Sequence, residues 1–202
     1  FLMGHSLLDR AEFAPRNADM ESRYKAGTVG VEEFTHFFIS TLAGRTPGEW
    51  EPWRQRFMAE VVAPRLPSDA HALVRHHQQA GDTVVLTTAT NRFITELTAQ
   101  HLGIDHLIAT DCALDAQGCF TGLSTGTLNM REGKVVRLNA WLQVRGQTLA
   151  ACHSTAYSDS TNDTAIGSFY LNAPSVDTSM EKIAAPWHGL WSVAIGGYKV
   201  PA

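Results

Sequence analysis

Residues 83–91 read TVVLTTATN, a β-branched apolar run that ends in hydroxyl and amide side chains. Residues 83–88 have almost no polar face, which is typical of a strand buried on both sides in a parallel sheet. The segment then enters a helix, so that a hydroxyl and several backbone N–H groups face one point. Such a point suits an oxyanion such as phosphate. The alternative is that Thr88 or Asn91 only caps the helix.

The residues on either side of this strand predict a βαβ unit. Before it, Ser68 is the expected N-cap of a helix that runs through His77. After it, a helix over residues 92–101 stops at Gly103, and a second short strand, HLIAT, covers residues 106–110. A strand, a helix and a strand at this spacing are typical of parallel α/β folds.

The rest of the chain divides into a helical beginning and an α/β remainder. Apolar and aromatic residues recur at helical spacing over residues 7–66, so we expect residues 1–66 to form a helical domain and residues 67–202 the α/β core. The core should also contain a β-hairpin, a helix, a third strand, a helix start and a fourth strand, over residues 112–126, 133–144, 154–158, 162–167 and 169–172.

Composition and charge exclude several classes of protein. The formal net charge is −4, the sequence pI is about 6.1, and no run of Lys or Arg is long enough to coat a nucleic acid. No apolar stretch approaches the ~20 residues of a membrane span, and the first residues lack the features of a signal peptide. The three cysteines have none of the paired spacings of a disulfide framework. We expect a cytoplasmic protein with neither nucleic acid nor membrane as partner.

Two more polar groups are expected at strand ends or helix starts, where open α/β sheets bind ligands. Asp159 and Asp163, in DSTND, directly follow the strand over residues 154–158, and their hard oxygen atoms suit Mg²⁺. The alternative is an N-cap within a polar loop. Lys134 begins a helix after Arg131-Glu132-Gly133 and could neutralise a phosphate or a carboxylate, although a single lysine there is more often solvated.

The order of these groups resembles the haloacid dehalogenase (HAD) superfamily. TTATN at residues 87–91 is similar to its second motif, REGKVVRL at 131–138 to its third, and YSDSTND at 157–163 to its fourth. YKAGTVGVEEF, HLIAT and CFTG are similar to its phosphoserine-phosphatase-like subclass IB. The resemblance covers roughly residues 1–163. It implies an α/β fold, a Rossmann-like three-layer core with a mostly parallel sheet, plus an inserted helical cap.

The resemblance also assigns roles to residues. Thr88 would hydrogen-bond the transferring phosphoryl group, within a phosphate-binding segment that includes Ala89 and Asn91, and Lys134 would balance the charge of the nucleophile and the phosphate. Asp159 would ligate Mg²⁺, Asp163 would support the metal and its water shell, and Asn162 would touch the phosphate or hold the loop.

The family's first motif is missing from this sequence. That motif, Asp-x-Asp after a buried strand, supplies the attacking aspartate, and residues 1–202 contain no such pattern. Asp9 and Asp19 lie in helical, polar contexts, so neither is assigned the role. We therefore expect the strand and its turn to lie upstream of Phe1.

The expected substrate is a small phosphorylated metabolite. Phosphoserine phosphatases present an arginine from the cap, whereas the corresponding stretch here, residues 32–38, reads EEFTHFF, so phosphoserine is not the first choice. His36 could face a substrate, but a histidine among phenylalanines is more often packed or solvated. Phosphoserine, histidinol phosphate and other phosphomonoesters all remain open.

The resulting hypothesis is a magnesium-dependent phosphomonoester hydrolase that works through an aspartyl-phosphate intermediate. The runner-up is a catalytically inactive relative that binds phosphate or a phosphorylated ligand without turning it over. Phosphoryl transfer to an acceptor other than water would use the same residues.

Overall fold

The computed structural model describes residues 1–66, 68–158 and 192–197 and divides the chain into two compact units. The helical unit contains Phe1–Pro64 and Cys112–Ser124, and the sheet unit contains Arg65–Asp111 and Thr125–Ala202. The predicted helix start at residues 162–167 and the predicted strand at 169–172 lie outside the described residues. None of the described helices is both long and apolar enough to cross a membrane.

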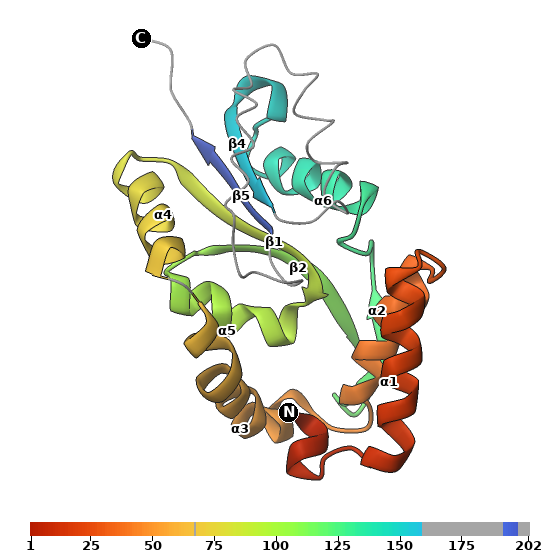
Figure 1. The fold of residues 1–202 in the computed structure, drawn as a ribbon. Coiled ribbons are helices and arrows are strands. Elements are labelled where there is room, and N and C mark those ends of the chain that lie inside the picture. The colour runs from red at the N-terminus through yellow and green to blue at the C-terminus, as the bar shows by residue number, and fades with distance from the viewer. Residues whose placement is uncertain (67, 159–191, 198–202) are drawn as a thin grey trace. The chain divides into compact units, whose positions relative to one another are not determined.

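Among the described residues, the sheet unit contains four strands in the order β2-β1-β5-β4 (Figure 1). They are β1 (Thr83–Asn91), β2 (His106–Leu114), β4 (His153–Ser158) and β5 (Ser192–Gly197). β1 is parallel to β2, while β5 is antiparallel to both β1 and β4. Because β5 is antiparallel to both of its neighbours, β4 is parallel to β1. The strands β1, β2 and β4 therefore all end at the same edge of the sheet, which we call the carboxyl edge.

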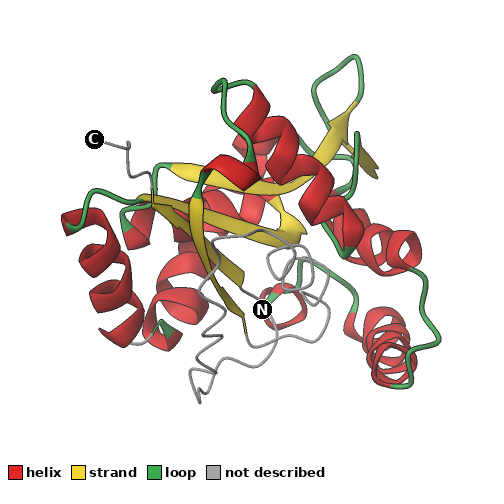
Figure 2. Ribbon diagram, turned by 90° about the horizontal axis from the view of Figure 1, so that it is seen from above, coloured by secondary structure: helices red, strands yellow, loops and turns green. Residues whose placement is uncertain are grey.

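Helices cover both faces of this sheet, as Figures 1 and 2 show. α4 (Ser68–Gln79) and α5 (Arg92–Leu102) contribute to a core cluster with Val84 and Leu86 of β1. α6 (Glu132–Gln143) packs in a second cluster with Val85. Successive side chains of a strand point to opposite faces, so the unbroken apolar run of β1 requires this double cover. The predicted three-layer α/β core is confirmed.

The helical unit is formed by α1 (Arg10–Lys25), α2 (Val31–Ile39) and α3 (Pro47–Phe57). β3 (Phe120–Thr125) forms the predicted hairpin with the end of β2, and Phe120 joins it to this unit. The Phe120 N–H donates to the Arg45 carbonyl at 2.9 Å, and its own carbonyl accepts from the Gly44 N–H at 2.9 Å. The short helical turns among the described residues are Leu2–His5, Ser40–Leu42, Met58–Val62, Ala63–Arg65 and Leu149–Ala151.

Asp9 has a structural role in the helical unit. It is the N-cap of α1, and its Oδ1 accepts hydrogen bonds from the N–H groups of Ala11 at 2.7 Å and Glu12 at 3.2 Å. A side chain that satisfies two helix N–H groups is used for capping. This agrees with leaving Asp9 out of the predicted catalytic residues.

Replacing Leu86 with alanine should destabilise the sheet unit strongly. Leu86 is 0% exposed in the centre of β1, and a buried Leu→Ala change leaves a cavity that costs about 2–5 kcal/mol. The free energy of unfolding, measured by urea titration, should fall by that amount. Val136→Ala in α6, where the side chain is 55% exposed, serves as the control and should change it by less than about 0.5 kcal/mol. Equal losses in the two variants would contradict this account of the core.

Candidate active site

The end of β1 is shaped by an irregularity in the sheet. Thr88 pairs with Ala109 of β2, but the next paired residue is Asn91, so Ala89 and Thr90 bulge out of the register. Thr88 is 2% exposed, and its Oγ1 accepts a hydrogen bond from the Thr90 N–H at 3.1 Å. Bulges often re-aim residues next to active sites. Here the bulge lies at the carboxyl edge, in the segment predicted to bind phosphate.

Asn91 adopts the capping role that was the alternative to phosphate binding. It is the N-cap of α5, and its side-chain oxygen accepts from the Ile94 N–H at 3.0 Å. Its carbonyl accepts from the Thr95 hydroxyl at 3.0 Å. The side-chain oxygen of Asn91 therefore fixes the start of α5.

Lys134 lies in the first turn of α6 and is buried, at 4% exposure. The ordinary expectation of a solvated lysine is wrong at this position. Lys134, Leu138 and Leu142 recur every four residues on one helix face, and all three are buried. This spacing is visible in the sequence and could have identified the lysine as an inward-facing charge.

The turn before Lys134 is tightly constrained. Arg131 has φ 49° and ψ −126°, a backbone conformation that L-residues rarely adopt. A Cβ placed on Gly133 would lie 1.9 Å from the Leu128 carbonyl oxygen, so only glycine fits there. Backbone strain of this kind is retained where the surrounding structure requires one conformation.

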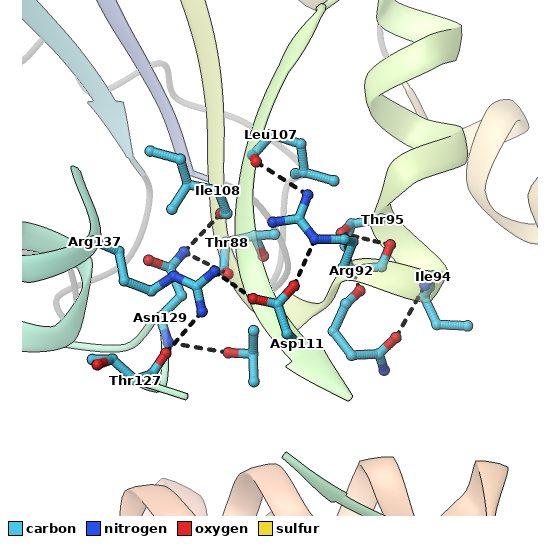
Figure 3. Close-up of polar contacts among 12 residues, drawn as sticks. Thr88, Arg92, Ile94, Thr95, Leu107, Ile108, Asp111, Thr127, Asn129 and Arg137 are labelled. Atoms are coloured by element: carbon cyan, nitrogen blue, oxygen red, sulfur yellow. Dashed lines mark hydrogen bonds and ion pairs between the residues drawn. The ribbon is translucent and has the colours of Figure 1, made fainter. Parts of the chain in front are cut away.

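Asn129, which the sequence analysis did not single out, connects this turn to the sheet (Figure 3). Its Nδ2, which carries two hydrogens, donates to the carbonyls of Thr88 and Ile108, each at 2.8 Å, and lies 3.0 Å from Thr87 Oγ1. Its backbone N–H donates to Thr110 Oγ1 at 3.1 Å. An asparagine in a loop gives no sequence signal for such contacts, because its partners are 19 to 42 residues away in the chain.

Asp111 joins the first residue of α5 to the middle of α6, again without a sequence signal. Its two oxygens accept hydrogen bonds at 2.6 Å, Oδ1 from Arg92 Nε and Oδ2 from Arg137 Nη2 (Figure 3). Arg137 also donates to the Thr127 carbonyl at 2.8 Å. Burial alone would raise the pKa of Asp111, but the hydrogen bonds from Arg92 and Arg137 and their charges outweigh it and lower that pKa.

The predicted metal ligands cannot be located within this geometry. Asp159, Asn162 and Asp163 lie outside the described residues. In the described parts of the chain, no group of three or more His, Cys, Asp or Glu residues could hold a metal ion. β4 ends at Ser158, which pairs with Ser192, and Ser192 also pairs with Thr87, so Ser158 and Thr87 occupy the same rung of the sheet.

Two histidines noted in the sequence make structural contacts. His36 Nε2 lies 3.1 Å from Ser124 Oγ within the helical unit. His77, at the end of α4, lies between Asp82 Oδ2, 2.7 Å from its Nδ1, and the Tyr157 hydroxyl, 3.0 Å from its Nε2. His77 therefore ties α4 to the last residues of β4.

Residues 1–167 match the sequence model of the haloacid dehalogenase-like hydrolases. The chain belongs to this family. This HAD hydrolase is 35% identical over 164 residues to a histidinol-phosphatase of Neisseria meningitidis serogroup C, a match that covers 81% of this chain and 74% of the relative. It is 30% identical over 125 residues to the phosphoserine phosphatase SerB1 of Mycobacterium tuberculosis, covering 62% of this chain but only 40% of that protein.

Solved structures support the same assignment. A Bordetella pertussis Tohama I protein of unknown function superposes with a TM-score of 0.73 at 40% identity, over 80% of this chain and 72% of that one. A substrate-bound phosphoserine phosphatase gives a TM-score of 0.54 at 16% identity, over 75% of this chain and 67% of that one, which supports the fold alone. The predicted resemblance to the phosphoserine-phosphatase-like HAD proteins is confirmed, as is the predicted enzyme class, a phosphatase-type hydrolase.

Asp111→Asn should change how the stability of the HAD hydrolase depends on pH. Because the folded-state pKa of Asp111 is lowered, its stabilising contribution is present above the unfolded value of about 3.9 and is lost as the pH falls through the folded pKa. The substitution should lower the free energy of unfolding at pH 7 by about 1–2 kcal/mol and have less effect at pH 3.

Urea unfolding at a series of pH values measures this effect. Asp105→Asn, at an exposed position just before β2, is the matched control and should leave stability nearly unchanged at pH 7. The assigned role of Asp111 would be wrong if its variant lost the same stability at pH 3 as at pH 7.

Proposed function

We propose that this chain is a magnesium-dependent phosphomonoester hydrolase that acts on a small phosphorylated metabolite through an aspartyl-phosphate intermediate. One observation carries the proposal: Thr88 and Lys134 are both buried, and Asn129 links the end of β1 to the turn that precedes Lys134. This arrangement occurs in a HAD hydrolase with relatives named as phosphatases.

The chemistry of phosphoryl transfer explains why these residue types suit the task. The transferring group spreads negative charge over its oxygens, so catalysis depends on positioned donors and positive charge. The Thr88 hydroxyl and the backbone of the bulge at Ala89 would orient the phosphoryl oxygens. A buried ammonium group is stable only beside anionic partners, and the phosphoryl group would be one for Lys134.

The proposed metal site depends on the segment after β4. Asp159 would ligate Mg²⁺, Asp163 would support the metal and its waters, and Asn162 would contact the phosphate or hold the loop. The donor set fits the ion, because Mg²⁺ is usually bound by one or two carboxylates together with waters and substrate phosphate. Ser158 ends β4 on the rung of Thr87, which supports the placement of Asp159 at the carboxyl edge. Bound Mg²⁺ would supply neutralising charge to the phosphoryl oxygens.

The attacking group in this proposal comes from outside residues 1–202. An aspartate carboxylate upstream of Phe1 would form a bond to phosphorus while the ester P–O bond breaks. The second aspartate of the same Asp-x-Asp motif would donate the proton that lets the leaving oxygen depart as an alcohol. Water would then hydrolyse the acyl phosphate and release inorganic phosphate. Neither Asp9, which caps α1, nor Asp19, which pairs with Arg23, is assigned this step.

The helical unit is the proposed cap, and its composition bears on the substrate. Phe37 stacks on Phe13 and meets Phe38 edge to face, so the stretch over residues 32–38 contributes aromatic rings where an arginine would favour phosphoserine. The relative with 35% identity is named a histidinol-phosphatase, which makes histidinol phosphate a candidate alongside other phosphomonoesters. The three free thiols of this chain, Cys112, Cys119 and Cys152, are compatible with a cytoplasmic location.

A second function would follow from the missing Asp-x-Asp pattern. A relative without the nucleophile would bind phosphate or a phosphorylated ligand at Thr88 and Lys134 and release it unchanged. Intact mass and N-terminal sequencing of the native protein separate the two functions, because hydrolysis requires an Asp-x-Asp segment before Phe1. The absence of that segment would rule out the hydrolase.

The native protein should hydrolyse p-nitrophenyl phosphate only with Mg²⁺, because the ion is proposed to neutralise the phosphoryl oxygens. Asp159→Ala should lower kcat/KM by at least about 10³-fold. Asp69→Ala, at an exposed position of α4, is the control and should keep full activity. Turnover that survives EDTA or the Asp159 substitution would refute the metal assignment.

Lys134→Met should lower kcat about 10²–10³-fold, because it removes a buried positive charge while keeping an apolar stem of similar length. Lys25→Met, at an exposed position of α1, should leave kcat unchanged. Steady-state kinetics and thermal melting, run side by side, separate loss of charge from loss of folding. A kcat within threefold of the wild type in a folded Lys134→Met protein would remove Lys134 from the site.

A further inference from the structure

Asn129 combines complete burial with an orientation that its partners impose. Its side chain is 0% exposed, and two of the three acceptors around Nδ2 are the carbonyl oxygens of Thr88 and Ile108. Carbonyl oxygens can only accept, so the group facing them must be the amide nitrogen. The residue therefore acts as a donor toward β1 and β2.

The other half of the same amide is not satisfied. Asn129 Oδ1 is buried and has no hydrogen-bond partner among the residues that the structure describes. Buried polar atoms are nearly always paired, and an exception calls for an explanation. The contacts of Nδ2 therefore fix the orientation of this amide, even though they leave Oδ1 without a hydrogen bond among the described residues.

The group that Asn129 holds is the peptide that begins the bulge. The Thr88 carbonyl belongs to the peptide unit between Thr88 and Ala89, directly before the two residues that leave the register. In a trans peptide the C=O and N–H point in opposite directions, so fixing the Thr88 carbonyl also fixes the direction of the Ala89 N–H. No peptide bond among the described residues is cis.

Asn129 also lies at the beginning of the turn that leads to Lys134. Only four residues separate Asn129 from Lys134, and they include the strained Arg131 and the sterically required Gly133. Because this connection is short and constrained, the hydrogen bonds that Asn129 makes to β1 set the position of α6 relative to that strand.

We propose that Asn129 is a positioning residue. It holds the Ala89 N–H and the Lys134 ammonium group at positions from which both can contact the same phosphoryl group. This role rests on the proposed phosphate site and assigns Asn129 no contact with the substrate. It acts through the Thr88–Ala89 peptide on one side and through the start of α6 on the other.

Kinetics of Asn129→Ala in the native protein test this role. With p-nitrophenyl phosphate, kcat should fall about 10- to 100-fold, because a displacement near 1 Å is costly in a positioned site. Asn139→Ala, in α6, is the matched control and should keep kcat. An Asn129→Ala kcat within twofold of the wild type would overturn the proposal.

A double-mutant cycle separates positioning from general destabilisation. If Asn129 acts through the Thr88–Ala89 segment, the kcat losses of Asn129→Ala and Thr88→Val should combine to less than their product. A purely structural role would leave the two losses multiplicative, and that result would also overturn the proposal.

Inorganic phosphate provides a readout that does not need turnover. Phosphate should raise the melting temperature of the wild type and shift its Ala89 amide NMR signal, and Asn129→Ala should lose both effects. If the wild type binds phosphate in this way without hydrolysing an ester, the proposed hydrolysis fails while the role of Asn129 stands. If phosphate leaves the wild-type Ala89 amide unmoved, the positioning proposal fails, whether or not Asn129→Ala folds.

Discussion

The burial of β1 on both faces is the constraint on which the rest of the sheet unit depends. Val85 packs in the cluster that contains α6, and Leu86 packs in the cluster that contains α4 and α5. A strand covered in this way has no solvent face for polar chemistry. Polar groups can therefore meet only where the strand ends, and the bulge after Thr88 provides that place.

Much of the architecture could be predicted because it depends on local patterns. The apolar run of β1 requires burial, and Gly103 ends α5 in a left-handed conformation, as a glycine after a helical pattern indicates. The antiparallel β5 could not be predicted, since the C-terminal residues have no clear alternation. Pairing of residues 192–197 with β1 and β4 is a long-range contact that no local pattern encodes.

Only part of the candidate site could be predicted from the sequence, because some of its residues act through long-range contacts. Thr88 and Lys134 were identified by the order of motifs, and the structure describes both as buried. Asn129 and Asp111 were missed because their roles exist only after β1, β2, α5 and α6 have come together. Asn91 shows the opposite case, in which a residue of a functional motif also carries an ordinary capping bond.

The carboxylate of Asp111, shared by Arg92 and Arg137, has a consequence beyond holding two helices. One negative charge between two guanidinium groups leaves this trio with one net positive charge at the carboxyl edge. That single positive charge acts on anions within about 8 Å of the trio at physiological ionic strength. The trio thus adds a short-range attraction for anionic groups that come close to Asp111, and added salt weakens it.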